Sequence, residues 1–389
     1  MNINYAEERK QIFAEAWRTL DMGFYDPQFH GQDWTKLKAK YKPWAEKSST
    51  DKDFTYVMNL MLGELNASHM GFYGKERAET QEDRTGLLGI EIEPLANGIR
   101  IAKIIGNTPA ANTNSQLKVG DVITAVNGAS VNSSANFYEP FLATANEKVI
   151  LTLVGGREVV IRPTASLRDA LYEQWVNDRK ALTDKYSNGR LGYIHIRGMN
   201  WTSFERFERE LMASGYGKEG IVVDVRFNGG GWTTDYLMTI LSVKQHAYTI
   251  PRGAAKDLEK EKSKFESYYP YGERLPFSAV AKPTIALCNE YSYSNAEIFS
   301  HAYKHLKLGT LVGQPTFGAV ISTSGRGLLG GHYVRLPFRG WYASSTNKNM
   351  DFDPAIPDIL IENAPNEKAK GEDSQLKKSV EELLKQLKK

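Results

Sequence analysis

The chain is 389 residues long, which corresponds to two or three domains at about 150 residues each. Its composition, with 41% hydrophobic and 24% charged residues, is that of a globular protein and excludes disordered and collagen-like classes. Lysine and arginine (49) nearly balance aspartate and glutamate (46), so the net charge of +3 gives no electrostatic indication of nucleic-acid binding.

The chain also lacks the signals of several other classes. Cys288 is the single cysteine, which excludes an intramolecular disulfide and a thiolate metal cluster. No apolar run reaches the roughly 18 residues that a membrane-spanning helix needs, so we expect no membrane insertion. The N-terminal sequence MNINYAEERKQIFAEAW is charged and helical, unlike a signal sequence. A cytoplasmic location is favoured, and a periplasmic one requires an export signal upstream of this chain.

Residues 1–78 are predicted to form a helical segment. Apolar residues recur at helical spacing over 12–20, and Asp33 is placed to cap a second helix that carries Trp34. The third helix has one continuous apolar stripe, formed by Phe54, Val57, Met58, Met61, Leu62 and Leu65. The stripe stops at Asn66, so Ser68 and His69 are expected just beyond the end of this helix.

Residues 79–165 change to the two-residue period of β-strands. Asn97-Gly98 predicts one hairpin turn, and Gly155-Gly156 predicts a second within KVILTLVGGREVVIRP. The segment resembles a PDZ domain, because T-G-L-L-G (85–89) stands where the carboxylate-binding loop would lie and L-K-V-G-D-V-I-T-A-V-N-G (117–128) matches the family's most recognisable stretch. Such domains usually take a peptide C-terminus as an added strand.

Residues 166–389 alternate strands and helices. Two units have the order strand, tight loop, helix: GIVVDVR followed by a glycine loop (229–231), and PTIALC followed by a polar loop that ends at Ser294. This order predicts a parallel α/β layer with its site at the carboxyl ends of the strands. The amphipathic helix over 376–387 is expected to pack on its own domain.

Several groups have a structural and a chemical interpretation. The glycine loop lacks the P-loop spacing, so it suits an oxyanion hole better than a phosphate site. Ser294 with Glu297 fits a helix capping box, and a serine there also lies at the positive end of a helix, as a nucleophile would. His69 alone is typical of a loop histidine. His301 and His305 have zinc-like spacing without a third ligand, and we interpret them as solvated side chains.

These pieces together resemble the tricorn branch of the C-terminal processing peptidases, over nearly the whole chain. The resemblance implies a core of the ClpP/crotonase type with an inserted PDZ domain and an N-terminal helical segment. L-N-A-S-H (65–69) matches the segment that supplies a serine-histidine pair, here Ser68 and His69. V-D-V-R-F-N-G-G-G (223–231) resembles the oxyanion loop, with Gly231 as donor. N-E-Y-S-Y-S-N-A-E-I-F-S (289–300) implies Ser294 as nucleophile and Asn295 as the second oxyanion donor.

One position separates the chain from most processing peptidases, and two positions depart from the tricorn branch. Most processing peptidases have a lysine base in T-F-G-K-G, whereas this chain has T-F-G-A-V with Ala319 there, so His69 must be the base of an enzyme. The family's final glutamate is absent, and counting back from a P-D-I strand gives Asp351, with Asp353 as the second choice. The aspartate that selects basic P1 side chains is replaced by Thr249, which implies an apolar or small P1.

The resemblance therefore implies a serine peptidase that acts on oligopeptides or unfolded proteins through a Ser-His-Ser-acid tetrad. It implies no metal and no organic cofactor, and it suggests a homo-oligomer. A catalytically silent peptide-binding protein on the same scaffold is the alternative. A crotonase-like acyl-CoA enzyme would share the oxyanion-hole core but would leave the PDZ-like segment and the Ser-His pair unexplained.

Overall fold

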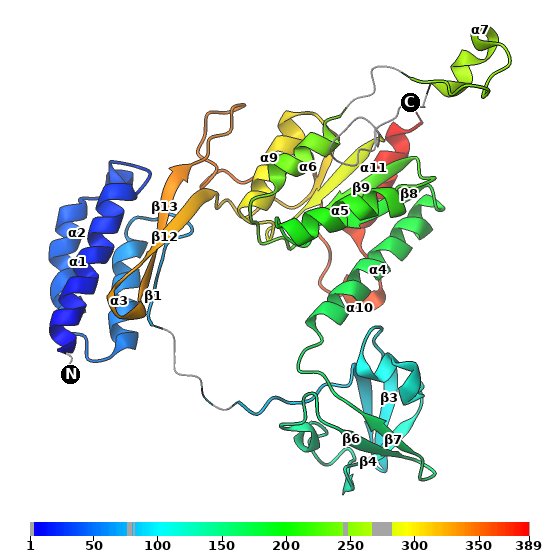
Figure 1. Cartoon of the computed structure of the whole chain (residues 1–389), viewed down its shortest axis with the longest axis horizontal. Coiled ribbons are helices and arrows are strands. Elements are labelled where there is room, and N and C mark those ends of the chain that lie inside the picture. The colour runs from blue at the N-terminus through cyan, green and yellow to red at the C-terminus, as the bar shows by residue number, and fades with distance from the viewer. Residues whose placement is uncertain (1–3, 76–79, 81, 244–247, 267–281, 389) are drawn as a thin grey trace. The chain divides into compact units, whose positions relative to one another are not determined.

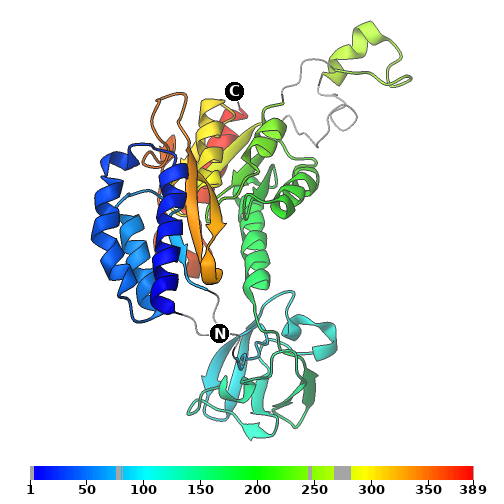
Figure 2. The ribbon, with the colours of Figure 1, turned by 60° about the vertical axis from the view of Figure 1, so that its left-hand side comes forward.

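The computed structural model describes residues 4–75, 80, 82–243, 248–266 and 282–388. It divides into two compact units, one formed by Met1–Arg77 with Lys180–Lys389 and the other by Ala78–Arg179. Figures 1 and 2 show the chain from two directions. The second unit interrupts the first in sequence, in agreement with an inserted domain. None of the described helices is both long and apolar enough to cross a membrane.

The first unit begins with three helices, α1 (Tyr5–Gly23), α2 (Trp34–Glu46) and α3 (Asp51–Gly63). Asp33 accepts the Lys36 N–H and caps α2, as predicted. The apolar stripes of these helices meet in one cluster, which buries Ile12, Phe13, Leu20, Trp34, Phe54, Met58, Met61 and Leu65. The helices form here because each buries one apolar face and is capped at its N-terminus.

A three-stranded antiparallel sheet joins the strand that follows these helices to two strands from the C-terminal part of the chain. Its order is β1 (Gly71–Tyr73), β13 (Tyr333–Gly340) and β12 (Ile321–Gly327). Val334 of β13 is buried in the helical cluster. Strand β1 follows His69 directly, so its pairing with β13 fixes the segment that carries the predicted base.

The core of the first unit is a five-stranded parallel sheet in the order β14-β11-β10-β9-β8. The strands are β8 (Leu191–His195), β9 (Gly220–Asp224), β10 (Thr284–Cys288), β11 (Leu311–Gly313) and β14 (Ile359–Leu360). All residues of β8 to β11 are buried, as expected for a parallel sheet covered on both faces. This is the predicted α/β layer.

The helices that accompany this sheet (Figure 1) are α5 (Trp201–Ala213), α6 (Thr234–Leu241), α9 (Asn295–His305) and α11 (Ser374–Gln386). Helix α4 (Arg168–Ser187) begins in the second unit and ends in the first. Leu376, Val380 and Leu383 of α11 are fully buried, and α11 packs on β9, β10 and β11. The prediction that the C-terminal helix packs on its own domain is confirmed. Short helices are α7 (Leu258–Glu261) and α10 (Glu367–Lys370), with 3-10 turns at 29–31, 109–111, 113–115, 139–141, 262–265 and 329–331.

The second unit is an antiparallel sheet in the order β2-β3-β4-β6-β7, with β5 on β4. The strands are β2 (Ile90–Leu95), β3 (Gly98–Ile104), β4 (Val122–Val126), β5 (Ala129–Ser130), β6 (Val149–Leu153) and β7 (Glu158–Ile161). Both predicted hairpins form. The first turn is one residue earlier than expected, because Leu95 pairs with Gly98. The predicted boundary at 78/79 lies outside the described residues, and the domain limits 79–165 remain a prediction.

A buried ion-pair cluster joins α11 to the core sheet. Arg226, 1% exposed, donates to both carboxylate oxygens of Asp224 and of Asp373, at 2.7 to 3.0 Å. Asp373 also caps α11 through the Leu376 N–H. Because all these charged groups are buried, they stabilise the fold only as a complete set.

We expect Asp373→Ala to lower the free energy of unfolding by about 3 to 5 kcal/mol, because it leaves the buried Arg226 guanidinium short of one partner. Urea unfolding followed by tryptophan fluorescence measures this. Asp33→Ala is the matched control: it removes an aspartate cap from an exposed helix end and should shift the midpoint much less. Equal shifts for the two variants would contradict the assignment.

Candidate active site

Ser294 lies on a sharp turn between β10 and α9. Its backbone has φ 56° and ψ −118°, a region that residues with a side chain rarely occupy. The turn is held by Glu297, whose carboxylate accepts the Ser294 N–H at 3.0 Å. The Ser294 hydroxyl lies 2.9 Å from His69 Nε2. Ser294 is therefore the N-cap residue of α9, as the capping box predicted, and its hydroxyl also faces the imidazole of His69. The structural and the chemical interpretation of Ser294 are thus compatible.

His69 is placed by the chain between α3 and β1. Its backbone is also left-handed, with φ 59°, and its side chain is 8% exposed. The imidazole stacks on the ring of Tyr293, with centroids 4.7 Å apart and planes at 20°. Residues 225 positions apart in the sequence, Ser294 and His69, thus form the contact that the sequence predicted only by resemblance.

Ser68 joins the imidazole to an acid. Its Oγ lies 2.8 Å from His69 Nδ1 and donates a short hydrogen bond to Asp351 Oδ1, while its N–H donates to Asp351 Oδ2 at 3.0 Å. Asp351 is 2% exposed. Asp353 instead lies 3.7 Å from the ammonium of Lys348. The structure thus brings Asp351, and not Asp353, to Ser68.

The distances of this chain of contacts are compatible with a proton arrangement that suits a base. If Ser68 donates its hydroxyl proton to Asp351, its oxygen is free to accept from His69 Nδ1–H. His69 Nε2 then carries a lone pair toward the Ser294 hydroxyl. This is the tautomer that a general base needs.

Burial sets the charge state of both titrating groups. It lowers the pKa of His69 to about 4, with a smaller contribution in the same direction from the charge of Arg335. Burial raises the pKa of Asp351 above its ordinary value, and the hydrogen bonds from Ser68 oppose that shift. His69 is therefore neutral at pH 7 and ready to accept a proton.

The glycine loop packs directly against the Ser294 turn. A Cβ on Gly230 would lie 2.7 Å from Ser294 Cβ, so only glycine fits there. Met199 N–H bonds to Gly230 O and Trp232 N–H bonds to Met199 O, which leaves the Gly231 N–H directed away from this pairing.

The Gly231 and Asn295 N–H groups are the predicted oxyanion donors. Within the described part of the chain, neither has a hydrogen-bond acceptor. Both residues line the cleft that contains Ser294. Two N–H groups without an acceptor beside the Ser294 hydroxyl are what an oxyanion hole would require.

Glu297 supports this turn in a way that the sequence indicated only as a helix cap. Its side chain is fully buried and accepts hydrogen bonds from the N–H groups of Ser294, Gly318 and Ala319 and from the Thr316 hydroxyl. Burial raises the pKa of this carboxyl, and the four donors oppose the shift. The loop in which processing peptidases have their lysine is thereby tied to the nucleophile turn.

The cleft around Ser294 has a volume of about 620 Å³. Its lining comprises His69, Gly229, Gly230, Gly231, Trp232, Asp235, Tyr293, Ser294, Asn295, Ile298, Val320, Ile321, Ser322, Thr323, Arg335, Phe338 and Trp341. Thr249, predicted to bind the substrate, is exposed and does not line this cleft. Asp235, Tyr293 and Arg335 line it without having been singled out in the sequence.

The two histidines with zinc-like spacing are used otherwise. His301, expected to be solvated, is half-buried, and its Nε2 lies 3.0 Å from the carbonyl oxygen of Asp353. His305 is exposed, near the hydroxyl of Ser344. Among the described residues, no group of three or more His, Cys, Asp or Glu side chains is placed to hold a metal ion.

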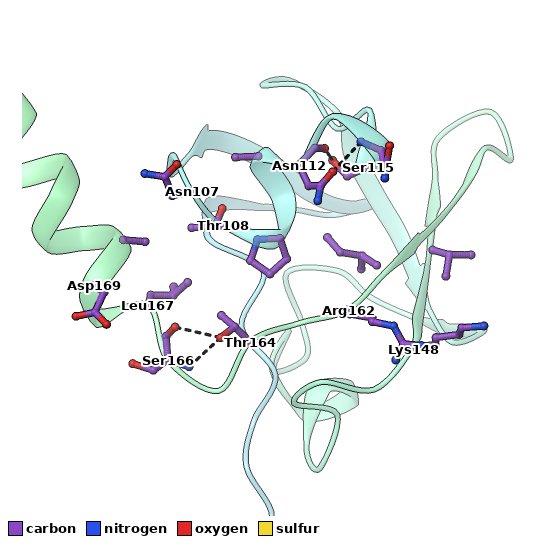
Figure 3. A pocket seen from close by; sticks show the side chains of 16 residues that line it. Asn107, Thr108, Asn112, Ser115, Lys148, Arg162, Thr164, Ser166, Leu167 and Asp169 are labelled. Atoms are coloured by element: carbon purple, nitrogen blue, oxygen red, sulfur yellow. Dashed lines mark hydrogen bonds between the residues drawn. The ribbon is translucent and has the colours of Figure 1, made fainter.

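A larger hollow, of about 860 Å³, lies in the second unit (Figure 3). Asn107, Thr108, Asn112, Lys148, Arg162 and Asp169 contribute to its lining. The hydroxyls of Thr108, Ser115 and Thr164 in its lining donate to backbone carbonyl groups and not to a base, so its size alone does not make it a catalytic site.

The predicted carboxylate-binding loop of this unit already contacts its own chain. Leu87 and Thr164 exchange backbone hydrogen bonds of 2.8 and 2.9 Å. Leu167 lines the small space of about 30 Å³ that remains beside the loop. The Leu87 N–H is therefore unavailable to a peptide carboxylate in this conformation.

Comparisons with known proteins agree with this architecture. Residues 5–63 match the tricorn protease C1 domain, 86–153 a PDZ domain and 190–361 peptidase family S41. The chain is 26% identical over 403 aligned positions to the tricorn protease of Thermoplasma volcanium, covering 99% of this chain and 37% of that protein. It is 28% identical to tricorn protease homolog 1 of Streptomyces coelicolor, covering 97% of this chain and 35% of that protein.

The same likeness holds in three dimensions. The crystal structure of the tricorn protease superposes with a TM-score of 0.85 at 25% sequence identity, covering 100% of this chain and 37% of the other. The chain thus spans only a little more than a third of the length of these relatives. In the tricorn order, this chain thus carries a tricorn C1 segment, a PDZ domain and a domain of peptidase family S41, a family of serine-type peptidases, and it is similar over its length to the tricorn protease.

Proposed function

We propose that this chain hydrolyses peptide bonds in oligopeptides or unfolded proteins, with Ser294 as nucleophile and His69 as general base. The observation that carries the proposal is the 2.9 Å contact between Ser294 Oγ and His69 Nε2 in an open cleft. A serine hydroxyl is a weak nucleophile until a base within hydrogen-bond reach takes its proton.

In the acylation step, Ser294 Oγ attacks the carbonyl carbon of the scissile bond while its proton passes to His69 Nε2. The N–H groups of Gly231 and Asn295 hold the oxyanion, where each donor contributes roughly 3 kcal/mol. His69 then gives the proton to the leaving nitrogen, the C–N bond breaks, and an ester to Ser294 remains. A water molecule deprotonated by His69 hydrolyses that ester and restores the serine.

Ser68 and Asp351 act behind the imidazole. Their contacts keep the proton of neutral His69 on Nδ1, and the negative charge of Asp351 stabilises the imidazolium that forms when Ser294 is deprotonated. Tyr293 restricts the ring by stacking. The domain limits 79–165 and a homo-oligomer remain predictions. The expectation of an apolar or small P1 depended on Thr249, which does not line the cleft.

A fluorophosphonate probe with intact-mass analysis tests this proposal. We expect one adduct on the wild-type chain and none on Ser294→Ala, since the probe needs a serine activated by a base. Ser322→Ala is the matched control, because Ser322 lines the same cleft and its hydroxyl accepts only from Trp341 among the contacts described. It should label like the wild type. A folded wild-type chain that gains no adduct would contradict the peptidase proposal.

A further inference from the structure

The turn between α1 and α2 contacts the segment that leads into the serine-histidine pair. His30 Nδ1 lies 2.8 Å from the carbonyl oxygen of Leu65, which is buried and comes three positions before Ser68. Because a carbonyl oxygen only accepts, Nδ1 of His30 carries the proton of this hydrogen bond. The imidazole of His30 therefore holds the start of the loop that places Ser68 and His69.

The same turn also contacts the segment that carries the acid. Tyr25 Oη lies 2.7 Å from His30 Nε2 and accepts a hydrogen bond of 2.9 Å from Asn349 Nδ2. Asn349 Oδ1 in turn accepts the Asp351 N–H at 3.0 Å. This series of hydrogen bonds thus runs from Leu65 to Asp351 through the side chains between them, and it joins two segments that lie far apart in the sequence.

The donors and acceptors of this series fit a neutral His30. The amide nitrogen of Asn349 only donates, so Tyr25 Oη accepts from it and keeps its own proton to give. With the proton of His30 on Nδ1, its Nε2 is the acceptor for the proton of Tyr25. Each polar atom of the two side chains then has a partner.

The turn that presents these side chains has an unusual backbone conformation. Phe29 and His30 are both left-handed, with φ 50° and 54°, a region that bulky residues rarely occupy. The Asp26 carboxylate accepts the His30 N–H at 2.8 Å. The ring of Phe29 stacks on that of Trp34, with centroids 5.2 Å apart. Strained backbone that surrounding contacts enforce is concentrated at functional sites.

The relative position of the two joined segments matters for the proposed reaction. Asp351 acts on His69 through the Ser68 hydroxyl, so the acid is effective only while the two segments keep their distance. A misplacement of about 1 Å can cost about 100-fold in rate. The contacts of Tyr25 and His30 join the same segments along a second path, which does not pass through Ser68.

We propose that Tyr25 and His30 are positioning residues that hold the acid-bearing segment 349–351 against the serine-histidine segment 65–69. Neither residue lines the cleft that contains Ser294, so they act through the groups they contact and not on the substrate. The inference rests on the proposed peptidase function and adds to it two residues from the N-terminal helical segment.

Tyr25→Phe tests this proposal, because it removes the hydroxyl and keeps the ring. Each hydrogen bond of ordinary net strength corresponds to a factor of about 2 to 10, and this variant loses two. We expect kcat for a fluorogenic peptide to fall by about 5- to 50-fold, with KM changed by less than about threefold. His30→Asn interrupts the same series and should act in the same direction, since asparagine tolerates a left-handed backbone.

Tyr342→Phe is the matched control. Tyr342 is exposed and lines the same hollow of about 330 Å³ as Tyr25 and His30. Its loss of a hydroxyl should leave kcat at the level of the wild type. Equal losses of kcat in Tyr25→Phe and Tyr342→Phe overturn the proposal, and so does wild-type kcat in both Tyr25→Phe and His30→Asn.

A double-mutant cycle separates positioning of the acid from a general structural role. In the background Asp351→Asn, where the acid is already lost, Tyr25→Phe should lower kcat by less than about twofold. A structural role gives the same loss of kcat in both backgrounds, because it does not depend on the acid. A full second loss would therefore mean that Tyr25 acts elsewhere, and the proposal would be wrong.

Hydrogen exchange followed by mass spectrometry tests the contacts without turnover. The Ser68 N–H donates to Asp351 and the Asp351 N–H donates to Asn349, so both amides are protected while the segments stay together. Tyr25→Phe should raise the exchange rate of the fragments that contain these two amides by at least about threefold and leave fragments of α9 unchanged.

The same measurement distinguishes this proposal from the proposed function. Faster exchange in Tyr25→Phe, with no fluorophosphonate adduct on the wild type, would reject the peptidase and retain the contact between the two segments. An adduct on the wild type, with unchanged exchange and unchanged kcat in Tyr25→Phe, would retain the peptidase and reject the positioning role.

Discussion

His69→Ala is expected to lower kcat by at least about 10²- to 10⁴-fold, the usual contribution of a positioned general base, with little change in KM. The physical reason is that Ser294 Oγ has His69 Nε2 as its described partner and keeps its proton without it. Steady-state hydrolysis of a fluorogenic peptide measures the loss. His305→Ala, on an exposed histidine of α9, is the control and should retain activity. Comparable losses in both variants would contradict the assignment.

The same histidine sets the acid limb of the pH profile. Only neutral His69 accepts the Ser294 proton, so activity falls as pH drops through the pKa of His69. Because burial and Arg335 lower that pKa to about 4, the rate of fluorophosphonate labelling should be half-maximal near pH 4 and flat from about pH 6 upward. An unshifted histidine would place the midpoint near about 6.5 instead. A midpoint there would mean that the imidazole is more hydrated than its burial indicates.

Much of the fold could be predicted from local patterns. The stripe from Phe54 to Leu65 predicted α3 because a helix that buries one face repeats its apolar residues every three or four positions. The two strand-loop-helix units predicted a parallel layer, and their strands β9 and β10 pair in parallel. These features depend on residues that are close together in the sequence, so the spacing of the apolar residues is enough to predict them.

The site was only partly predictable, because its contacts are long-range. Ser294 and His69 were identified through motifs. Asp351 was found by counting back from the P-D-I strand, which only a few residues separate from it. Counting placed Thr249 at a substrate-binding position on the assumption of no insertion after Gly231, yet Thr249 is exposed and outside the cleft. Arg335 carries no motif, and the pairing of β13 with the distant strands β1 and β12 accompanies its position in the lining of the cleft.

Tyr293 and Glu297 illustrate a second limit. Both lie within three residues of Ser294 in sequence, but Tyr293 is recognised by its stacking on His69 and its hydroxyl contact with His69 Nδ1, and Glu297 by donors from 316–319. A local pattern assigned Glu297 to a helix cap, which is correct and incomplete. Glu297 thus satisfies the local capping pattern and also joins the Ser294 turn to the loop 316–319, which lies further along the sequence.

The choice between Asp351 and Asp353 leads to the second large expected effect. Asp351→Asn should lower kcat by roughly 10- to 10³-fold and leave KM and the fold largely unchanged, because asparagine has nearly the same volume. The amide nitrogen would donate to Ser68 Oγ, and Ser68 would then donate to His69 Nδ1. The proton of the neutral imidazole would move to Nε2, where it blocks acceptance of the Ser294 proton.

Asp353→Asn is the matched variant, two residues away with the same change of charge. It should have a far milder effect, since Asp353 contacts Lys348 and not Ser68. Single-turnover kinetics with both variants and thermal unfolding as a check on folding decide between the two residues. The reverse ranking would assign the acid to Asp353, and near-wild-type kcat in both would remove an acid from the mechanism. A large loss of kcat in Asp351→Asn alone would mean that the carboxylate of Asp351, acting through the Ser68 hydroxyl, determines which nitrogen of His69 carries the proton.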